Sequence, residues 1–171
     1  MKPFKTSNFT VEAHSDADLG GCRTSRKSTS GGCLALNGPI VHTWAKQQQT
    51  VADSSAESEF IGLAQACKEI LYMTEFFDEI GIKLQNVPTL LVDNIAAISM
   101  IVSNIKSRVK HLDRKQYWIR HYIKEDRITV KHKDGKINLA DLFTKFVDAK
   151  TLKRLRPAVM GSSYPPLVVE D

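Results

Sequence analysis

The sequence predicts an α/β domain built around a five-stranded mixed sheet that is flanked by helices. The chain opens with three short strand-like segments, continues with one long amphipathic helix, and then contains an apolar run typical of a strand buried on both faces. At 171 residues, with 42% hydrophobic and 25% charged residues, it has the size and composition of one globular domain. We place that domain at residues 1–160 and expect an irregular tail at 161–171.

The first three strands are expected to be consecutive and antiparallel. Residues 8–16 alternate between apolar and polar side chains, a period of two that predicts a strand with one buried face. Residues 20–31 are rich in Gly, Ser, Thr and Arg, which predicts a loop. Two short strands should follow at 32–36 and 40–45, because Asn37-Gly38 between them favours the tight turn of a β-hairpin.

A long helix is expected over residues 55–80. Ser54 and Glu57 fit a capping box at its start, and Gly81 stands where a C-terminal cap belongs. The apolar run Thr89–Val92 then predicts a buried fourth strand. The remaining expected elements are helices at 94–103, 109–124, 138–146 and 151–156 and a fifth strand at 128–132.

Composition argues against a membrane protein and against a disulfide-bonded one. No apolar stretch approaches the roughly 20 residues of a membrane span, and the N-terminus lacks the apolar core of a signal peptide. The three cysteines, Cys22, Cys33 and Cys67, have neither the spacing of a zinc site nor that of a redox motif. We therefore expect reduced thiols, no membrane partner and a cytoplasmic, intracellular location.

The net charge of +5 is unevenly distributed along the chain. Between Lys106 and Lys124 there are seven Lys or Arg and one acid, so this segment carries +6 and the remainder about −1. A basic face on a near-neutral body is typical of proteins that bind a phosphate backbone. A merely solvated helix face is the alternative, and four candidate metal ligands elsewhere in the chain favour the nucleic-acid interpretation.

Four acids lie where a metal-dependent nuclease would need them. Asp16 closes the first predicted strand and Asp93 the fourth, while Glu59 and Asp141 lie near the starts of two helices. Acids held together repel one another, and two divalent metal ions about 4 Å apart would supply the compensating charge. If the first and fourth strands are adjacent and parallel, Asp16 and Asp93 meet at their carboxyl ends, where ligands usually bind in open α/β sheets.

Three of these acids also have a structural interpretation. Asp16 could be a turn-forming residue, and Asp18 beside it is not excluded as a ligand. Asp93 could cap the following helix, although Asn94 could do so equally well. Asp141 could complement a helix dipole. A carboxylate that leaves a buried strand is costly to desolvate without a partner, which favours a metal at Asp93.

The long helix offers two candidate ligands, Glu57 and Glu59. They are about 200° apart around the helix, so only one of them can face a given site. Glu57 already has a role in the capping box, and Glu59 aligns with residues expected to face the sheet, at positions 63, 66 and 70. We favour Glu59, but helical geometry alone leaves the choice open.

Other polar residues are candidates for proton transfer or for phosphate contacts. His132 precedes a Lys-Asp-Gly-Lys loop, where a histidine could shuttle a proton or help product leave; an ordinary surface histidine is the alternative. Ser54 and Ser55 lie at a helix N-terminus, whose backbone N–H groups attract anions. The candidate nucleic-acid contacts are Arg26, Lys27, Ser28, Ser54, Ser55, Asn94, Lys110, Arg114 and Lys115.

Several motifs in order resemble the ribonuclease H domain of copia-type long-terminal-repeat retrotransposon polyproteins. They are Ser15-Asp-Ala-Asp18, Arg26-Lys-Ser-Thr-Ser-Gly31, Ser54-Ser-Ala-Glu-Ser-Glu-Phe60, Val92-Asp-Asn94, Lys110-His-Leu-Asp113 and Leu139-Ala-Asp-Leu-Phe-Thr-Lys145. Together they cover about residues 13–156, nearly the whole chain. Two positions depart from the family pattern: Leu19 replaces a usual Trp, and Phe146 replaces a usual Pro.

The resemblance implies the ribonuclease H fold, in which the first, fourth and fifth strands run parallel. It implies hydrolysis of RNA paired with DNA, using two Mg²⁺ ions for which Mn²⁺ is expected to substitute. The family's four acids fall on Asp16, Glu59, Asp93 and Asp141, which selects Glu59 over Glu57. A histidine before the last acid assists turnover in related enzymes, which suggests His132. The implied partner is an adjoining or separate reverse transcriptase segment. The resemblance also implies that the protein can be located in the virus-like particles of a retrotransposon.

Three rival interpretations remain. A catalytically silent module could bind hybrids or support a polymerase without cutting, although four intact acids argue against decay. A recombinase or integrase on the same fold usually carries two Asp followed by Glu, whereas here the order is Asp, Glu, Asp, Asp with gaps of 43, 34 and 48 residues. A purely structural α/β protein would not need the clustered acids.

Overall fold

A computed structural model of the chain describes residues 9–102 and 110–161. Its five strands form one mixed sheet in the order β3-β2-β1-β4-β5. The strands are β1 (Val11–Ala17), β2 (Thr29–Leu36), β3 (Ile40–Gln47), β4 (Thr89–Val92) and β5 (Thr129–His132). β2 is antiparallel to both β1 and β3, whereas β4 pairs in parallel with both β1 and β5. The predicted fold class and strand directions are therefore confirmed.

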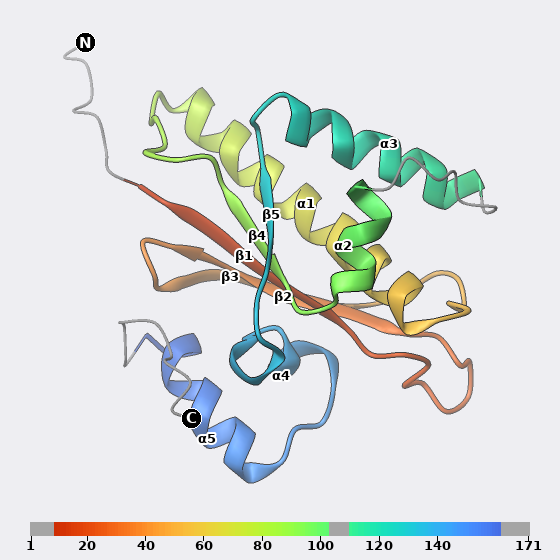
Figure 1. The fold of residues 1–171 in the computed structure, drawn as a ribbon. Coiled ribbons are helices and arrows are strands. Elements are labelled where there is room, and N and C mark those ends of the chain that lie inside the picture. Colours follow the sequence, from red (N-terminus) through yellow and green to blue (C-terminus); the bar gives the residue numbers. More distant parts are fainter. Residues whose placement is uncertain (1–8, 103–109, 162–171) are drawn as a thin grey trace.

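Helices lie on both sides of this sheet (Figure 1). They are α1 (Ser55–Glu79), α2 (Ile95–Val102), α3 (Lys110–Lys124), the 3₁₀ helix η1 (Gly135–Ile137), α4 (Asp141–Thr144) and α5 (Ala149–Val159). The main core joins α1, α2 and α3 to one face of the sheet, through residues such as Leu34 and Phe60. Cys33, the neighbour of Leu34 in β2, points to the other face and packs with Leu139 and Leu155 under α4 and α5.

The helix α1 begins and ends where its capping residues predict. The hydroxyl of Ser54 accepts a hydrogen bond from the N–H of Glu57 at 3.2 Å. The Glu57 carboxylate accepts from the N–H of Asp53 at 3.0 Å, one residue earlier than a standard capping box would have it. Gly81 follows the helix with a φ of +74°, a left-handed conformation that glycine adopts without a steric penalty.

Several predicted boundaries differ from the structure. Residues 29–31 belong to β2 rather than to the preceding loop, because Ser30 and Gly31 pair with both β1 and β3 and Thr29 pairs with β3. Of the helix expected over 138–146, only the four-residue α4 forms, and the 3₁₀ turn η1 lies before that range. The last helix is longer than expected, and Asp148 caps it by accepting from the N–H of Thr151 at 2.6 Å.

Gln116 interrupts the apolar stripe of α3 for a reason that the sequence does not show. Its side chain is buried, and its amide donates a hydrogen bond to the carbonyl of Met100 at the end of α2. No described helix combines the length and the hydropathy that a membrane crossing requires. Apart from Gly161, the expected irregular tail at 161–171 lies outside the described residues.

Candidate active site

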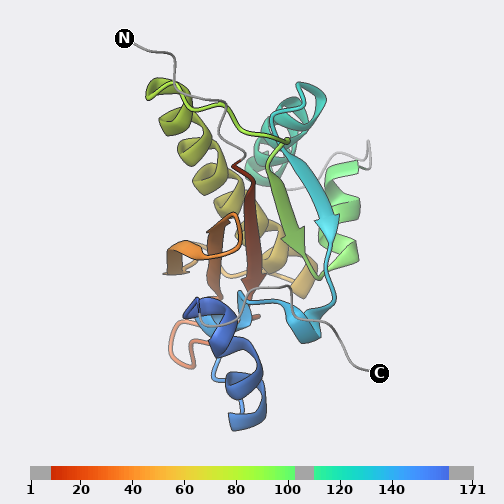
Figure 2. The same ribbon diagram turned by 90° about the vertical axis from the view of Figure 1, so that its left-hand side faces the viewer.

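The parallel pairing of β1 with β4 brings two of the predicted acids to one edge of the sheet. Ser15 is paired with Val92, so Asp16 and Asp93 are the next residues along two neighbouring parallel strands. Figure 2 shows the carboxyl end of β1 directed toward α4. Asp16 lies within β1, and Asp93 follows directly after β4. Strand topology alone thus places both carboxylates at the same end of the sheet.

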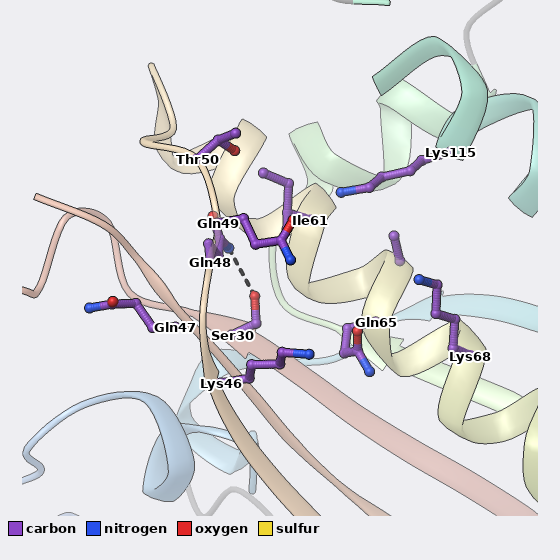
Figure 3. A pocket seen from close by; sticks show the side chains of 11 residues that line it. Ser30, Lys46, Gln47, Gln48, Gln49, Thr50, Ile61, Gln65, Lys68 and Lys115 are labelled. Carbon is purple, nitrogen blue, oxygen red and sulfur yellow. Dashed lines mark hydrogen bonds between the residues drawn. The ribbon is translucent and has the colours of Figure 1, made fainter. Parts of the chain in front are cut away.

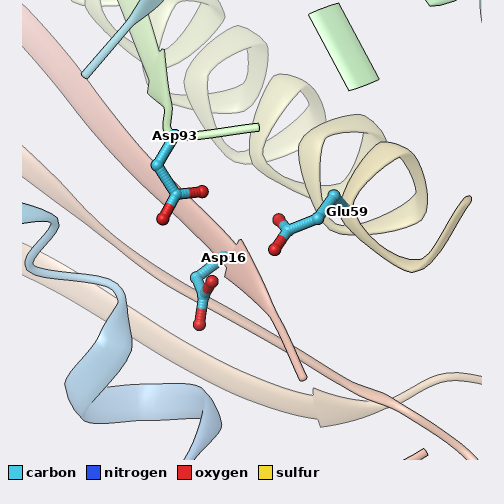
Figure 4. A group of neighbouring side chains, drawn as sticks. All are labelled: Asp16, Glu59 and Asp93. Carbon is cyan, nitrogen blue, oxygen red and sulfur yellow. The ribbon is translucent and has the colours of Figure 1, made fainter. Parts of the chain in front are cut away.

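Helix α1 contributes a third carboxylate to this edge. The side chains of Asp16, Glu59 and Asp93 point toward one another (Figure 4), and each offers a carboxylate oxygen within 4.8 Å of the others. Gly62, one turn after Glu59, lets the helix approach the strand closely. A Cβ atom at Gly62 would lie 3.1 Å from the carbonyl oxygen of Asp16. The structure therefore brings Glu59 into the cluster, whereas Glu57 stays at the helix cap.

Burial makes this cluster electrostatically unfavourable without a cation. The exposed fraction of Asp16 is 1% and that of Glu59 is 7%. Burial, followed by the negative charges of Asp16 and Asp93, raises the pKa of Glu59 to about 9. Burial and the charge of Asp16 likewise raise the pKa of Asp93. Oε2 of Glu59 is buried without a hydrogen-bond partner. Three converging hard oxygen ligands, one of them unpartnered, fit a Mg²⁺ or Mn²⁺ ion.

Asp141 lies beside the three clustered acids and is linked to them through a lysine. Nζ of Lys145 is 2.8 Å from Oδ1 of Asp141 and 3.4 Å from Oδ2 of Asp16. Burial raises the pKa of Asp141, while its hydrogen bond to Lys145 acts in the opposite direction. Asp141 is thus close enough to join the site, but its carboxylate pairs with Lys145 and is not one of the three that cluster. The metal-binding role of all four acids stays a prediction.

Two further polar residues, which the sequence did not single out, hold Asp16 and its strand in place. The hydroxyl of Thr144 donates a hydrogen bond to Oδ2 of Asp16. The side-chain amide of Asn138 is fully buried and donates to the carbonyl of Ser15 at 3.0 Å. Both residues, like Lys145, lie within four positions of Asp141, and Thr144 belongs to the motif Leu139–Lys145. Nothing in that motif reveals that these side chains reach back to β1.

Asp18, which remained open as a ligand, has a different role. Its carboxylate accepts a hydrogen bond from the N–H of Thr29. This bond closes the loop between β1 and β2. His132 lies at the rim of the site, where Nε2 donates to the carbonyl oxygen of Asp93 at 3.1 Å. Its participation in turnover stays a prediction.

Some of the predicted nucleic-acid contacts are accessible to solvent, and others already make hydrogen bonds within the protein. Arg26, Ser54, Ser55 and Arg114 are exposed, and Lys27 and Lys115 are half-buried. Ser28 is fully buried, and its hydroxyl accepts from the N–H of Gly20 at 3.0 Å, so it holds the loop instead of facing solvent. Asn94 caps α2 by accepting from the N–H of Ala97 at 3.0 Å. The side chain of Lys110 lies outside the described residues.

Lys115 lines a cavity that the sequence did not predict. The cavity has a volume of about 450 Å³ and lies between α1, α3 and the segment that follows β3 (Figure 3). Lys46, Lys68 and Lys115 enter it from three different elements, beside Gln48 and Gln65. Burial and the charge of Lys68 lower the pKa of Lys115. Converging lysines with no carboxylate in the cavity lining form a surface that attracts anions.

Comparison with known proteins agrees with this architecture. The chain is 29% identical over 145 residues to the retrovirus-related Pol polyprotein from transposon TNT 1-94 of Nicotiana tabacum, which covers 84% of this chain and 11% of the relative. It is also 29% identical over 163 residues to the Pol polyprotein from transposon RE2 of Arabidopsis thaliana, covering 95% of this chain and 11% of the relative. Among solved structures, LC11-RNase H1, isolated from compost, superimposes with a TM-score of 0.57 at 15% identity, covering 81% of this chain and 94% of that one.

This chain is a ribonuclease H-fold domain related to retrotransposon Pol polyproteins. It spans about a tenth of the length of the curated relatives that it matches. No protein-family model matches it. The resemblance noted in the sequence motifs is therefore confirmed at the level of fold and of relatives. At 15% identity, the likeness to LC11-RNase H1 shows the fold alone.

Proposed function

We propose that this ribonuclease H-fold domain hydrolyses the RNA strand of RNA/DNA hybrids as the ribonuclease H part of a retrotransposon polyprotein. The observation that carries the proposal is the convergence of Asp16, Glu59 and Asp93 within 4.8 Å. Two buried carboxylates and a half-buried one destabilise a fold unless they serve a cation. Their position at the carboxyl edge of parallel strands is where such folds bind ligands. The relatives add support, since they are transposon Pol polyproteins.

Two Mg²⁺ ions, replaceable by Mn²⁺, would be held by the four acids. Asp16, Glu59 and Asp93 fit one ion, and Asp141 with Asp16 would serve a second. Bound in such a pair, the ions supply an activated water and charge stabilisation for the leaving 3′ oxygen. The protein's own contribution is positional. Thr144 fixes the Asp16 carboxylate, and the backbone carbonyl of Asp93 orients His132 at the rim.

The basic surface fits the backbone of a duplex better than it fits particular bases. Ser54 and Ser55 offer an exposed helix N-terminus, and Lys115 and Lys68 face a lysine-lined cavity on the flank of the same helix. Such contacts favour recognition of helix shape and 2′-hydroxyls rather than sequence. LC11-RNase H1 has a structure in complex with an RNA/DNA hybrid, with a TM-score of 0.57 to this chain. We extend that substrate class to this chain as part of the proposal.

The partner and the location follow from the same reasoning. The matched relatives are Pol polyproteins of which this chain corresponds to about a tenth. We therefore propose that the domain works beside a reverse transcriptase segment, in the cytoplasm or in virus-like particles.

The decisive experiment incubates the protein with Mg²⁺ and a hybrid labelled on each strand in turn. We expect cleavage of the RNA strand alone, with 5′-phosphate and 3′-hydroxyl products. Asp93→Asn should lose this cleavage, and Glu57→Gln, which alters a cap outside the cluster, should keep it. Salt-sensitive hybrid binding without cleavage by the wild type would instead support a catalytically silent module.

A further inference from the structure

Lys145 occupies a position that a metal ion would be expected to fill. Its ammonium group lies between two acids, 2.8 Å from Asp141 and 3.4 Å from Asp16. The side chain is 45% exposed, so its aliphatic stem can turn without unpacking the core. Among the described residues, neither Glu59 nor Asp93 forms an ion pair with a basic side chain. The lysine therefore pairs directly with one half of the acidic site, and its charge acts on Glu59 and Asp93 only from a longer distance.

We propose that Lys145 is a positioning residue that holds the place of the second divalent cation, between Asp16 and Asp141, until substrate draws the lysine away. This inference rests on the proposed function and deepens it, because it concerns how the site is loaded. The first cation can bind Asp16, Glu59 and Asp93 while Lys145 stays where it is. The second cation needs carboxylate oxygens of Asp16 and Asp141 that are now paired with the ammonium group.

The local structure explains why the lysine reaches this position. Lys145 lies four residues after Asp141, and the two side chains of such a pair meet across one helical turn. Thr144, directly before it, is hydrogen-bonded to Asp16 and anchors the end of α4 against β1. A lysine is a point charge on a flexible stem, unlike the rigid fork of an arginine. A backbone phosphate at the site would therefore compete for the ammonium group and free both carboxylates.

Binding of Mn²⁺ without nucleic acid tests the inference directly. Free Mn²⁺ is followed by electron paramagnetic resonance during titration of the wild-type protein, Lys145→Met, Lys145→Arg and Lys150→Met. The methionine variant keeps the length of the stem and removes the charge. The Lys150 variant is the matched control, because Lys150 is an exposed lysine of α5. A thermal melt of each variant without metal shows that it is folded.

We expect the wild type, Lys145→Arg and Lys150→Met to bind one Mn²⁺ tightly and a second weakly. Lys145→Met should bind the second Mn²⁺ at least tenfold more tightly, with the first site changed much less. Equal or weaker second-site binding in Lys145→Met, with the first site intact, would overturn this inference and leave the proposed function standing. Failure of the wild type to bind any Mn²⁺ would overturn both. A second variant, Lys145→Gln, should repeat the result of the methionine variant.

Discussion

Gly31 of β2 lies so close to Thr144 of α4 that no residue with a Cβ atom would fit at position 31 without moving its neighbours. A Cβ atom on Gly31 would lie 2.7 Å from Cγ2 of Thr144 and 2.7 Å from the carbonyl oxygen of Phe143. The same Thr144 donates its hydroxyl to Asp16. The absence of a side chain at Gly31 therefore sets the distance between the sheet and the segment that carries Asp141 and Lys145.

Gly31→Ala should consequently disturb both the stability and the site. Overpacking of this kind typically costs about 1–3 kcal/mol of unfolding free energy, measurable by urea denaturation. Because α4 must move, we also expect cleavage of a hybrid to fall more than hybrid binding. Thr144→Ser removes Cγ2 but keeps the hydroxyl, so the double variant should recover part of the loss. Equal stability of Gly31→Ala and wild type would contradict the close contact.

The raised pKa of Glu59 predicts an unusual dependence of stability on pH in the metal-free protein. The unfolded chain releases this proton near pH 4.5, whereas burial and the neighbouring acids keep it on the folded protein up to about pH 9. Between these values the folded state binds more protons, so the unfolding free energy falls as pH rises, by at most about 1.4 kcal/mol per pH unit for this one group. Asp93 and Asp141, whose pKa values are also raised, act in the same direction.

Urea denaturation in EDTA from pH 5 to pH 9 measures this dependence. Glu59→Gln should be less sensitive to pH and more stable than the wild type at the alkaline end. Glu57→Gln should retain the wild-type slope, since Glu57 lies at the cap of α1. Added Mg²⁺ should reduce the slope, because it favours the charged carboxylates. A wild-type stability that rises with pH throughout this range, with the same slope in Glu59→Gln, would contradict the raised pKa of Glu59.

Much of the fold was predictable because its signals are local. The alternation in β1, the Asn37-Gly38 turn and the caps of α1 each depend on a few adjacent residues. The boundaries at β2 and α4 were less accurate, because residues 29–31 become a strand only by pairing with two distant segments.

The candidate site follows the same division between local and distant information. The meeting of Asp16 and Asp93 follows from strand order, which the sequence pattern suggests. By contrast, the contacts of Thr144, Asn138 and Lys145 with β1 join residues more than 120 positions apart. The cavity likewise brings together lysines from three elements. The sequence pattern of each element shows only that its lysine is on the surface. Long-range side-chain contacts of this kind leave no periodic trace in one sequence.

The cavity predicts which lysines contribute to binding of nucleic acid. Lys68→Gln and Lys115→Gln should each weaken hybrid binding for all sequences alike, since a phosphate contact carries no base information. Each should also reduce the slope of log K against log salt by about one unit. Fluorescence anisotropy at several salt concentrations measures both quantities. Lys153→Gln, an exposed lysine on α5, is the control. An unchanged salt slope in both cavity variants would exclude the cavity from the interface.

Asn94 offers a test that separates a structural role from a binding role. As the cap of α2, it accepts a hydrogen bond from Ala97, and Asn94→Ala should cost about 1 kcal/mol of unfolding free energy. Asn94→Ser retains a capping hydroxyl and should restore most of that stability. If Asn94 also contacts the hybrid, both variants should weaken hybrid binding equally. Binding that recovers together with stability in Asn94→Ser would assign the residue to capping alone.

Cys22 is predicted to be the reactive thiol among the three cysteines. Hydrogen bonds from the hydroxyl and N–H of Ser25 and from the N–H of Thr24 lower its pKa to about 7. Burial raises the pKa of Cys33 to about 12 and raises that of Cys67 as well. Because the thiolate is the nucleophile, iodoacetamide should modify Cys22 first. The rate of modification should rise with pH and reach half of its maximum near pH 7. Ser25→Ala should move that midpoint upward. Modification mapped by mass spectrometry to Cys33 or Cys67 before Cys22 would contradict this assignment.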